Sequence, residues 1–132
     1  MDKESIGLLK GYLEKADQKL RAATELLKAA AYEDAVSRAY YCAFHAAQAV
    51  LLAEGLSART HQGVVNLFGL HIVQTGIMSK KFGKMLNNLK DDRETSDYAV
   101  LSFIDEETAE NALKEAEEFL KEAKQYLVRH LK

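Results

Sequence analysis

The chain has 132 residues, of which 48% are hydrophobic and 29% are charged, and its formal net charge at pH 7 is −2. This length can bury the core of one domain and is short for two, so we expect a single domain over residues 1–132. The absence of proline favours helices throughout, and a single cysteine excludes an internal disulfide. No segment resembles a signal peptide or a membrane span, which predicts a cytoplasmic protein with no membrane association.

The first half of the chain predicts three helices. Apolar residues alternate at spacings of three and four over residues 6–27, which is typical of a long helix in a bundle. A second helix is predicted over residues 32–54, and Gly55 suits a left-handed cap at its end. Thr60 is placed to cap a shorter third helix that stops near Gly76.

The second half predicts two more helices. Ser79 is placed to cap a fourth helix, which should end within residues 93–98. Asp105 opens the last helix, whose apolar row over residues 109–126 can pair with the first helix. These elements predict an all-α fold, an antiparallel up-and-down bundle of four to five helices with short connections.

Charge is unevenly distributed along the chain. Residues 79–93 carry five basic and two acidic side chains, whereas residues 105–132 carry eight acidic and five basic ones. A basic segment such as residues 79–93 is typical of a solvated helix face. The alternative is that this segment forms a surface that binds an anionic ligand. In that alternative Lys80, Lys81 and Lys84 bind the ligand together with Arg93.

The second predicted helix places several polar groups on one stripe. Helical spacing brings Arg38, Tyr41, Cys42 and His45 to the same face, with Asp34 one turn before them. One interpretation is a structural network that includes an Asp34–Arg38 ion pair. The other is a phosphate or nucleotide contact, with Arg38 as the charged anchor and Tyr41 and His45 as hydrogen-bonding partners. Cys42 is predicted to be a small buried hydrophobic residue rather than a nucleophile.

A second polar cluster lies at the end of the fourth predicted helix and contains Arg93, Asp97 and Tyr98. An arginine suits a phosphodiester because its planar guanidinium holds two oxygens and stays charged. Tyrosine is a poor general base at neutral pH, so Asp97 is the candidate base or an ion-pair partner of Arg93. The structural alternative is a salt bridge at a helix end, with Tyr98 packed on the bundle.

No metal or cofactor site is predicted. The sequence has no glycine-rich phosphate loop, no cysteine pair and no His-Glu-x-x-His helix. The histidines at positions 45, 61, 71 and 130 are scattered, so a metal site from His45 and His61 would require the fold to bring them together with a carboxylate.

Three segments resemble a known family. They are the run Ser37-Arg38-Ala39-Tyr40-Tyr41-Cys42-Ala43-Phe44-His45-Ala46-Ala47, the later Thr60-His61-Gln62-Gly63-Val64, and Arg93-x-x-x-Asp97-Tyr98. Together they resemble a small prokaryotic branch of the HEPN (higher eukaryotes and prokaryotes nucleotide-binding) domains. The resemblance implies an all-α homodimer with a cleft at its interface, often encoded beside a minimal nucleotidyltransferase in toxin–antitoxin pairs. Many HEPN members resemble metal-independent ribonucleases.

The chain departs from the ribonuclease pattern of that family. The pattern has an arginine, usually a polar residue after it, and a histidine beyond four to six intervening positions. Arg93 and Glu94 match its start, whereas Tyr98 stands in the place of the histidine. Arg38 and His45 fit the spacing but lie on the second predicted helix.

The function we predict is therefore a dimeric HEPN-like module that binds nucleotide or RNA phosphate and partners a minimal nucleotidyltransferase. One alternative is an active metal-independent ribonuclease that uses Arg93 with Asp97, Tyr98 or His45. A second alternative is a purely structural helical adaptor.

Overall fold

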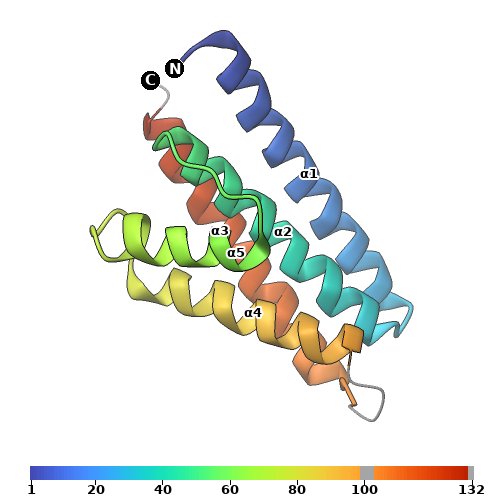
Figure 1. The fold of residues 1–132 in the computed structure, drawn as a ribbon. Coiled ribbons are helices and arrows are strands. Elements are labelled where there is room, and N and C mark those ends of the chain that lie inside the picture. The colour runs from blue at the N-terminus through green and yellow to red at the C-terminus, as the bar shows by residue number, and fades with distance from the viewer. Residues whose placement is uncertain (99–102, 131–132) are drawn as a thin grey trace.

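The computed structural model describes residues 1–98 and 103–130, and within them it contains helices and no strand. Figure 1 shows the long helices of the bundle running side by side, with a second pair of helices lying across them at an angle. In chain order they are α1 (Lys3–Lys28), α2 (Tyr32–Ala53), α3 (His61–Phe68), the π-helical segment η1 (Gly69–Val73), α4 (Lys80–Tyr98) and α5 (Glu106–His130). The predicted all-α bundle of four to five helices is confirmed.

Most predicted helix ends are confirmed by capping contacts or by backbone conformation. The Thr60 side chain accepts a 2.9 Å hydrogen bond from the Gly63 amide, and Asp105 accepts one of 2.8 Å from Thr108. Gly55 and Gly76 have φ values of 75° and 82°, in the left-handed region that favours glycine. The third predicted helix differs in its second half, where η1 continues α3 with a wider turn.

Helix α2 is the centre of the bundle and packs against α1, α3, α4 and α5. Its alanines let these neighbours approach closely, and five of them are fully buried: Ala39, Ala43, Ala46, Ala47 and Ala49. The predicted pairing of the first and last helices is present, but it is less extensive than the packing of each of them against α2. Helices α1 and α5 meet α2 more extensively than each other, and Lys124 of α5 forms a 2.7 Å ion pair with Asp17 of α1.

The central position of α2 divides its predicted polar stripe. Cys42 is completely buried, and burial raises the pKa of its thiol to about 12. Arg38 and Asp34 are exposed near the start of the helix and do not form the predicted ion pair. Tyr41 and His45 are partly buried. The prediction that Cys42 is a small buried hydrophobic residue is confirmed, and the stripe is therefore not one continuous polar face, because α2 has neighbours on almost every side.

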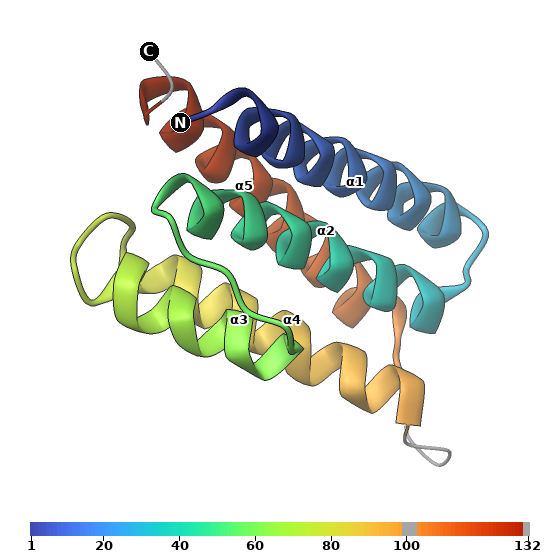
Figure 2. The same cartoon turned by 45° about the horizontal axis from the view of Figure 1, so that its top comes forward.

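Helices α3 and α4 lie side by side against the long helices, as both views show (Figures 1 and 2). Phe119 of α5 fixes this pair, because its ring lies 5.3 Å from that of Phe68 in α3 and 6.2 Å from that of Phe82 in α4. The far end of α4 is held on α2, where the Ser96 hydroxyl donates a 2.8 Å hydrogen bond to the Glu33 carbonyl. This arrangement brings Arg93 to the side of α2 that carries its aromatic residues.

None of the helices in the described part of the chain combines the length and the apolar character that crossing a membrane requires.

Candidate functional site

Five rings from α2 and α3 form a cluster, which we call the aromatic cluster: Tyr40, Tyr41, Phe44, His45 and His61. Spacings of three and four place the α2 members on adjacent turns, and Thr60 starts α3 so that His61 reaches them. The Phe44 and His61 rings stack with centroids 4.2 Å apart and planes 11° apart. The Tyr41 ring lies 5.6 Å from His61 and 6.2 Å from His45, so it joins the two histidines.

A hydrogen bond between Tyr40 and His61 fixes the state of both groups. The Tyr40 hydroxyl lies 2.7 Å from His61 Nδ1. Burial raises the pKa of Tyr40, so this hydroxyl keeps its proton and donates it to the imidazole. Burial, followed by the charges of Arg93 and Lys90, lowers the pKa of His61. His61 is therefore neutral at pH 7 and carries its own proton on Nε2.

Arg93 of α4 lies against the aromatic cluster. Its Nη2 atom donates a 2.9 Å hydrogen bond to the Tyr41 hydroxyl, and its Nε atom pairs with Asp97 Oδ2 at 2.9 Å. The guanidinium carbon lies 5.7 Å from the Tyr40 ring centroid and 5.4 Å from that of Tyr41, within the range of cation–π attraction. The side chain is only 14% exposed, so these contacts hold a charge that is largely removed from water.

His45 lies at the other edge of Tyr41 and has the opposite tautomer. Its Nδ1 atom is 2.9 Å from Gln48 Oε1. A carbonyl oxygen can only accept, so Nδ1 carries the proton and Nε2 keeps its lone pair. Burial is the largest cause of the lowered pKa of His45, with the charges of Lys15 and Lys19 adding to it. His45 is therefore a neutral base at pH 7.

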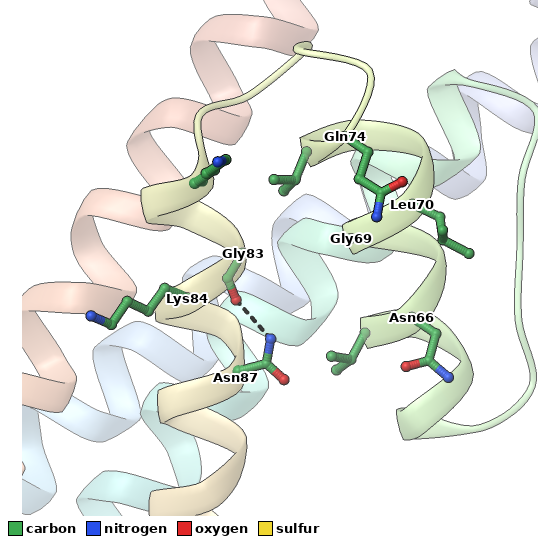
Figure 3. A pocket seen from close by; sticks show the side chains of 10 residues that line it. Asn66, Gly69, Leu70, Gln74, Gly83, Lys84 and Asn87 are labelled. Atoms are coloured by element: carbon green, nitrogen blue, oxygen red, sulfur yellow. Dashed lines mark hydrogen bonds between the residues drawn. The ribbon is translucent and has the colours of Figure 1, made fainter.

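A cleft of about 520 Å³ lies between α3 with η1 on one side and α4 on the other, and we call it the α3–α4 cleft. Figure 3 shows the Asn87 side chain reaching into the space between the two helices, whereas the Lys84 and Leu70 side chains extend from the sides of their helices that face away from it. Asn87 Nδ2 donates a 3.0 Å hydrogen bond to the Gly83 carbonyl, which fixes its amide. The polar lining residues are Asn66, Gln74, Lys80, Lys84 and Asn87, and the others are Val65, Gly69, Leu70, Val73 and Gly83.

The structure brings together some of the residues singled out from sequence and separates others. Arg93, Asp97 and Tyr41 are in direct contact, with His45 against the Tyr41 ring. Lys80 and Lys84 line the α3–α4 cleft.

The remaining predicted residues lie elsewhere. Lys81 pairs with Glu118 of α5, on a different side of α4 from the cleft. Arg38 is exposed on α2. Tyr98 is the last residue of α4, and its side chain lies outside the described part of the chain.

Three members of the aromatic cluster were not among the predicted site residues: Tyr40, Phe44 and His61. The sequence singles out His61 in the family resemblance and in the weighed metal site with His45, but not as a partner of Tyr40 or Phe44. The one local sign of the position of His61 is the capping residue Thr60 before it, which shows that His61 begins a helix. Tyr40 and His61 stand 21 positions apart in the sequence, and nothing in the intervening segment indicates that the two side chains meet.

His45 and His61 each lie beside the Tyr41 ring, with centroid distances of 6.2 Å and 5.6 Å. However, within residues 1–98 and 103–130 no group of three or more histidine, cysteine or acidic side chains is arranged to hold a metal ion.

The fold and the site define a class of all-helical domains that hold an arginine against the aromatic side chains of a central helix. The chain belongs to the HEPN domain family, which matches residues 9–126.

Relatives of known sequence cover most of the chain. A protein of Methanocaldococcus jannaschii named "Putative toxin MJ0605" is 36% identical over 119 residues, which is 90% of this chain and 88% of that protein. A "UPF0332 protein" of Thermotoga maritima is 39% identical over 107 residues, covering 81% of this chain and 80% of the relative.

Two solved structures share the fold. The crystal structure of TT1696 from Thermus thermophilus matches with a TM-score of 0.77 and 21% identity, covering 89% of this chain and 97% of that one. The structure of ST0689, an archaeal HEPN homologue, matches with a TM-score of 0.65 and 17% identity, covering 89% and 95%.

Proposed function

We propose that this HEPN domain binds RNA through a phosphate held at Arg93. The observation that carries the proposal is the position of the guanidinium, fixed between the Tyr41 hydroxyl and the Asp97 carboxylate over two tyrosine rings. A preorganised arginine loses little freedom on binding, and its planar donors match phosphate oxygens. The Asp97 side chain is 31% exposed, so a phosphate can replace it as the partner of Arg93.

The rings beside Arg93 favour RNA over a simple anion. Tyr41, His45 and His61 are each partly exposed at the surface of the aromatic cluster. Nucleobases stack on such rings, and each stacked base contributes about 1–3 kcal/mol in single-strand binding. His61 also presents its Nε2 proton as a hydrogen-bond donor. A phosphate anchor beside aromatic faces is the combination that single-stranded RNA requires.

The assembly we propose is a homodimer that partners a minimal nucleotidyltransferase in a toxin–antitoxin pair. The family resemblance supports both parts, and the toxin names of two Methanocaldococcus jannaschii relatives support the second. Light scattering should give about twice the chain mass of 14.8 kDa. A nucleotidyltransferase encoded beside this chain should copurify with it, and a monomer at all concentrations would refute the dimer.

RNA binding can be tested by fluorescence anisotropy with a labelled single-stranded RNA at two salt concentrations. We expect salt-sensitive binding that Arg93→Ala weakens by about tenfold or more. Arg21→Ala is the matched control, because it removes the same charge from an exposed position on α1. Arg93→Lys keeps the charge but lacks the planar guanidinium, so its affinity for RNA should lie between those of wild type and Arg93→Ala. Equal affinities for wild type and Arg93→Ala would refute the proposal, as would wild-type protein that binds no RNA.

A second candidate function is a metal-independent ribonuclease, and the tautomer of His45 favours it. The His45 Nε2 lone pair can take the proton of a ribose 2′-hydroxyl as that oxygen attacks the phosphorus atom. The bond from phosphorus to the 5′-oxygen then breaks, and the departing 5′-oxygen takes a proton from water, which leaves a 2′,3′-cyclic phosphate. Arg93 stabilises the charge that develops on the phosphate oxygens. Cleavage in the presence of a chelator should then be lost in His45→Ala and on a 2′-deoxy substrate. RNA that stays intact with purified wild-type protein would exclude this candidate.

A further inference from the structure

The connection between α2 and α3 covers a small pocket. It does not lead away from the bundle but returns alongside α2, as both ribbon views show (Figures 1 and 2). Its two ends are fixed, because the Leu56 amide donates a 2.8 Å hydrogen bond to the Leu51 carbonyl and the Thr60 side chain caps α3. A pocket of about 130 Å³ lies where this connection meets α1, α2 and α3, and we call it the Gln48 pocket.

The lining of the Gln48 pocket is apolar apart from three groups. These are the hydroxyls of Tyr12 and Ser57 and the carboxamide of Gln48. The apolar lining residues are Leu8, Leu51, Leu52, Leu56, Ala58 and Val64. None of the described residues that line the pocket is charged, so nothing there offsets the cost of removing an ion from water. The occupant that this lining suits is therefore uncharged and mostly apolar.

The size and the depth of the pocket limit the occupant further. Leu51 and Val64 are each 1% exposed and close its inner side, whereas Leu8 on α1 is 51% exposed at its rim. A cavity of about 150 Å³ with an aliphatic and aromatic lining takes up benzene. The Gln48 pocket is of similar size and therefore suits a single six-membered ring.

Gln48 connects this pocket to the candidate site. Its Oε1 atom accepts the 2.9 Å hydrogen bond from His45 Nδ1, one turn earlier on α2. The amide nitrogen of the same side chain carries two hydrogens and can donate to a ligand oxygen in the pocket. A hydrogen bond at this nitrogen polarises the amide and strengthens the bond that its oxygen accepts. An occupant that bonds to Gln48 therefore acts on the ring of His45.

We propose that the Gln48 pocket binds a small uncharged molecule that carries a hydroxyl on a six-membered ring, of which phenol is the simplest. The ring fills the leucine-lined space, and the hydroxyl oxygen accepts a hydrogen bond from Gln48 Nε2. Tyr12 and Ser57 offer oxygens to which the ligand hydroxyl can donate, and this favours a hydroxyl over a carbonyl or an ether. Through Gln48 the ligand also acts on His45 and so on RNA at the Arg93 site, and this last step rests on the proposed function.

The pocket is tested by titrating phenol into the isotope-labelled full chain without RNA, while NMR follows the Gln48 side-chain amide and the ring nitrogens of His45. Benzene is the matched ligand, because it has the ring without the oxygen. Ala58→Leu fills the pocket, and Ala29→Leu is its control, since it makes the same change at the exposed end of α1. Thermal unfolding shows whether both variants are folded. If Ala58→Leu is not, Gln48→Leu decides, because it removes the amide and keeps a side chain of similar size.

We expect phenol to shift the Gln48 and His45 signals and to bind at about millimolar concentration. Ala58→Leu should weaken phenol binding by about tenfold or more, with Ala29→Leu unchanged. Wild type should bind benzene about fivefold more weakly than phenol, and Gln48→Leu should bind phenol no better than benzene. Phenol should also change the affinity of wild type for a labelled single-stranded RNA but not that of Gln48→Leu.

Absence of any shift at Gln48 with about 10 mM phenol would overturn the inference, as would equal phenol affinities of wild type and a folded Ala58→Leu. Equal affinities of wild type for phenol and benzene would refute the hydrogen bond to Gln48. A shift at Gln48 without one at His45, or an RNA affinity that phenol leaves unchanged, would refute the action on the Arg93 site while the pocket stands. The phenol titration contains no RNA, so a wild type that binds no RNA would refute the proposed function and leave the pocket to be decided by phenol.

Discussion

Helix α4 has a different neighbour on each of two sides, and the two sides carry opposite charge. Toward α3 it lines the α3–α4 cleft with Lys80 and Lys84, and further along it places Arg93 on the aromatic cluster. Toward α5 it lines a hollow of about 360 Å³, which we call the acidic hollow. The residues that line the acidic hollow are Asn88, Asp91, Asp92, Thr108, Asn111 and Glu115.

Burial acts on both sides of α4 with opposite results. In the acidic hollow it raises the pKa of Glu115, and the charges of Asp92 and Glu118 add to the effect. On the other side burial lowers the pKa of His61, with Arg93 and Lys90 adding to it. Removal from water always favours the neutral form, which is protonated for a carboxyl and deprotonated for an imidazole. The α3 side of α4 therefore disfavours an added positive charge, and the α5 side disfavours an added negative charge.

The largest expected loss of stability comes from substitution of Phe119, whose ring packs against both α3 and α4. Its ring is 1% exposed and contacts Phe68 and Phe82. Phe119→Ala should lower the free energy of unfolding by about 3–5 kcal/mol, because a large cavity opens where three helices meet. Urea unfolding followed by circular dichroism would measure it. Phe119→Leu should lose distinctly less, and equal losses for the two variants would contradict the cavity explanation.

The next change concerns the α3 side alone. Thr60→Ala removes the cap of α3, and we expect it to cost about 1 kcal/mol of unfolding free energy. Since Thr60 immediately precedes His61, the same variant should weaken RNA binding. Thr60→Ser keeps the capping oxygen and is the control for both measurements. An alanine variant as stable as wild type would show that the Gly63 amide finds another partner.

A smaller change is expected in how the stability of the folded protein depends on pH, through His61 on the α3 side of α4. Because the pKa of His61 is lowered in the folded protein, the unfolded chain takes up this proton first as the pH falls. The stability associated with neutral His61 is present above pH about 6.5 and is lost on acidification below it. Thermal unfolding between pH 7 and 5.5 should therefore show a smaller loss in His61→Gln than in wild type. The same loss in both would mean that His61 does not contribute.

The smallest change is expected in the acidic hollow and has the opposite sign. The raised pKa of Glu115 means that the folded protein holds this proton more tightly than the unfolded chain, so ionised Glu115 is destabilising at pH 7. Glu115→Gln should raise the melting temperature by about 1–2 °C at pH 7. The gain should disappear near pH 3, where the carboxyl is protonated in both states. Glu117→Gln on the exposed face of α5 is the control, and a destabilised Glu115→Gln would refute the assignment.

The sequence predicts the helices well because their causes are local. Residues such as Thr60, Gly55 and Asp105 act on backbone groups within a few positions, so their roles follow from neighbouring residues. The seam of the first helix was also found from its spacing, and Leu9, Ala16 and Ala23 are buried on it. The order of packing was not predicted, because alanine-rich α2 allows several neighbours and its own pattern does not choose among them.

The candidate site was predicted only where its members share one helix. Arg93 and Asp97 are four residues apart on α4, and their ion pair follows from that spacing. The bonds from Arg93 to Tyr41 and from Tyr40 to His61 cross 52 and 21 residues. Such contacts depend on the angles at which helices cross, which arise from the packing of whole surfaces. The role of the arginine therefore follows from the sequence, whereas the rings on which it lies follow only from the packing of the helices.

The burial of Cys42 gives the chain an internal reporter of its own opening. The thiol is the one cysteine in the sequence and is fully buried in α2, and its high pKa leaves almost no thiolate at neutral pH. A thiol-specific reagent can react only when the bundle separates around α2. The labelling rate of the unmodified protein therefore measures how often its central helix becomes exposed, with and without a bound ligand.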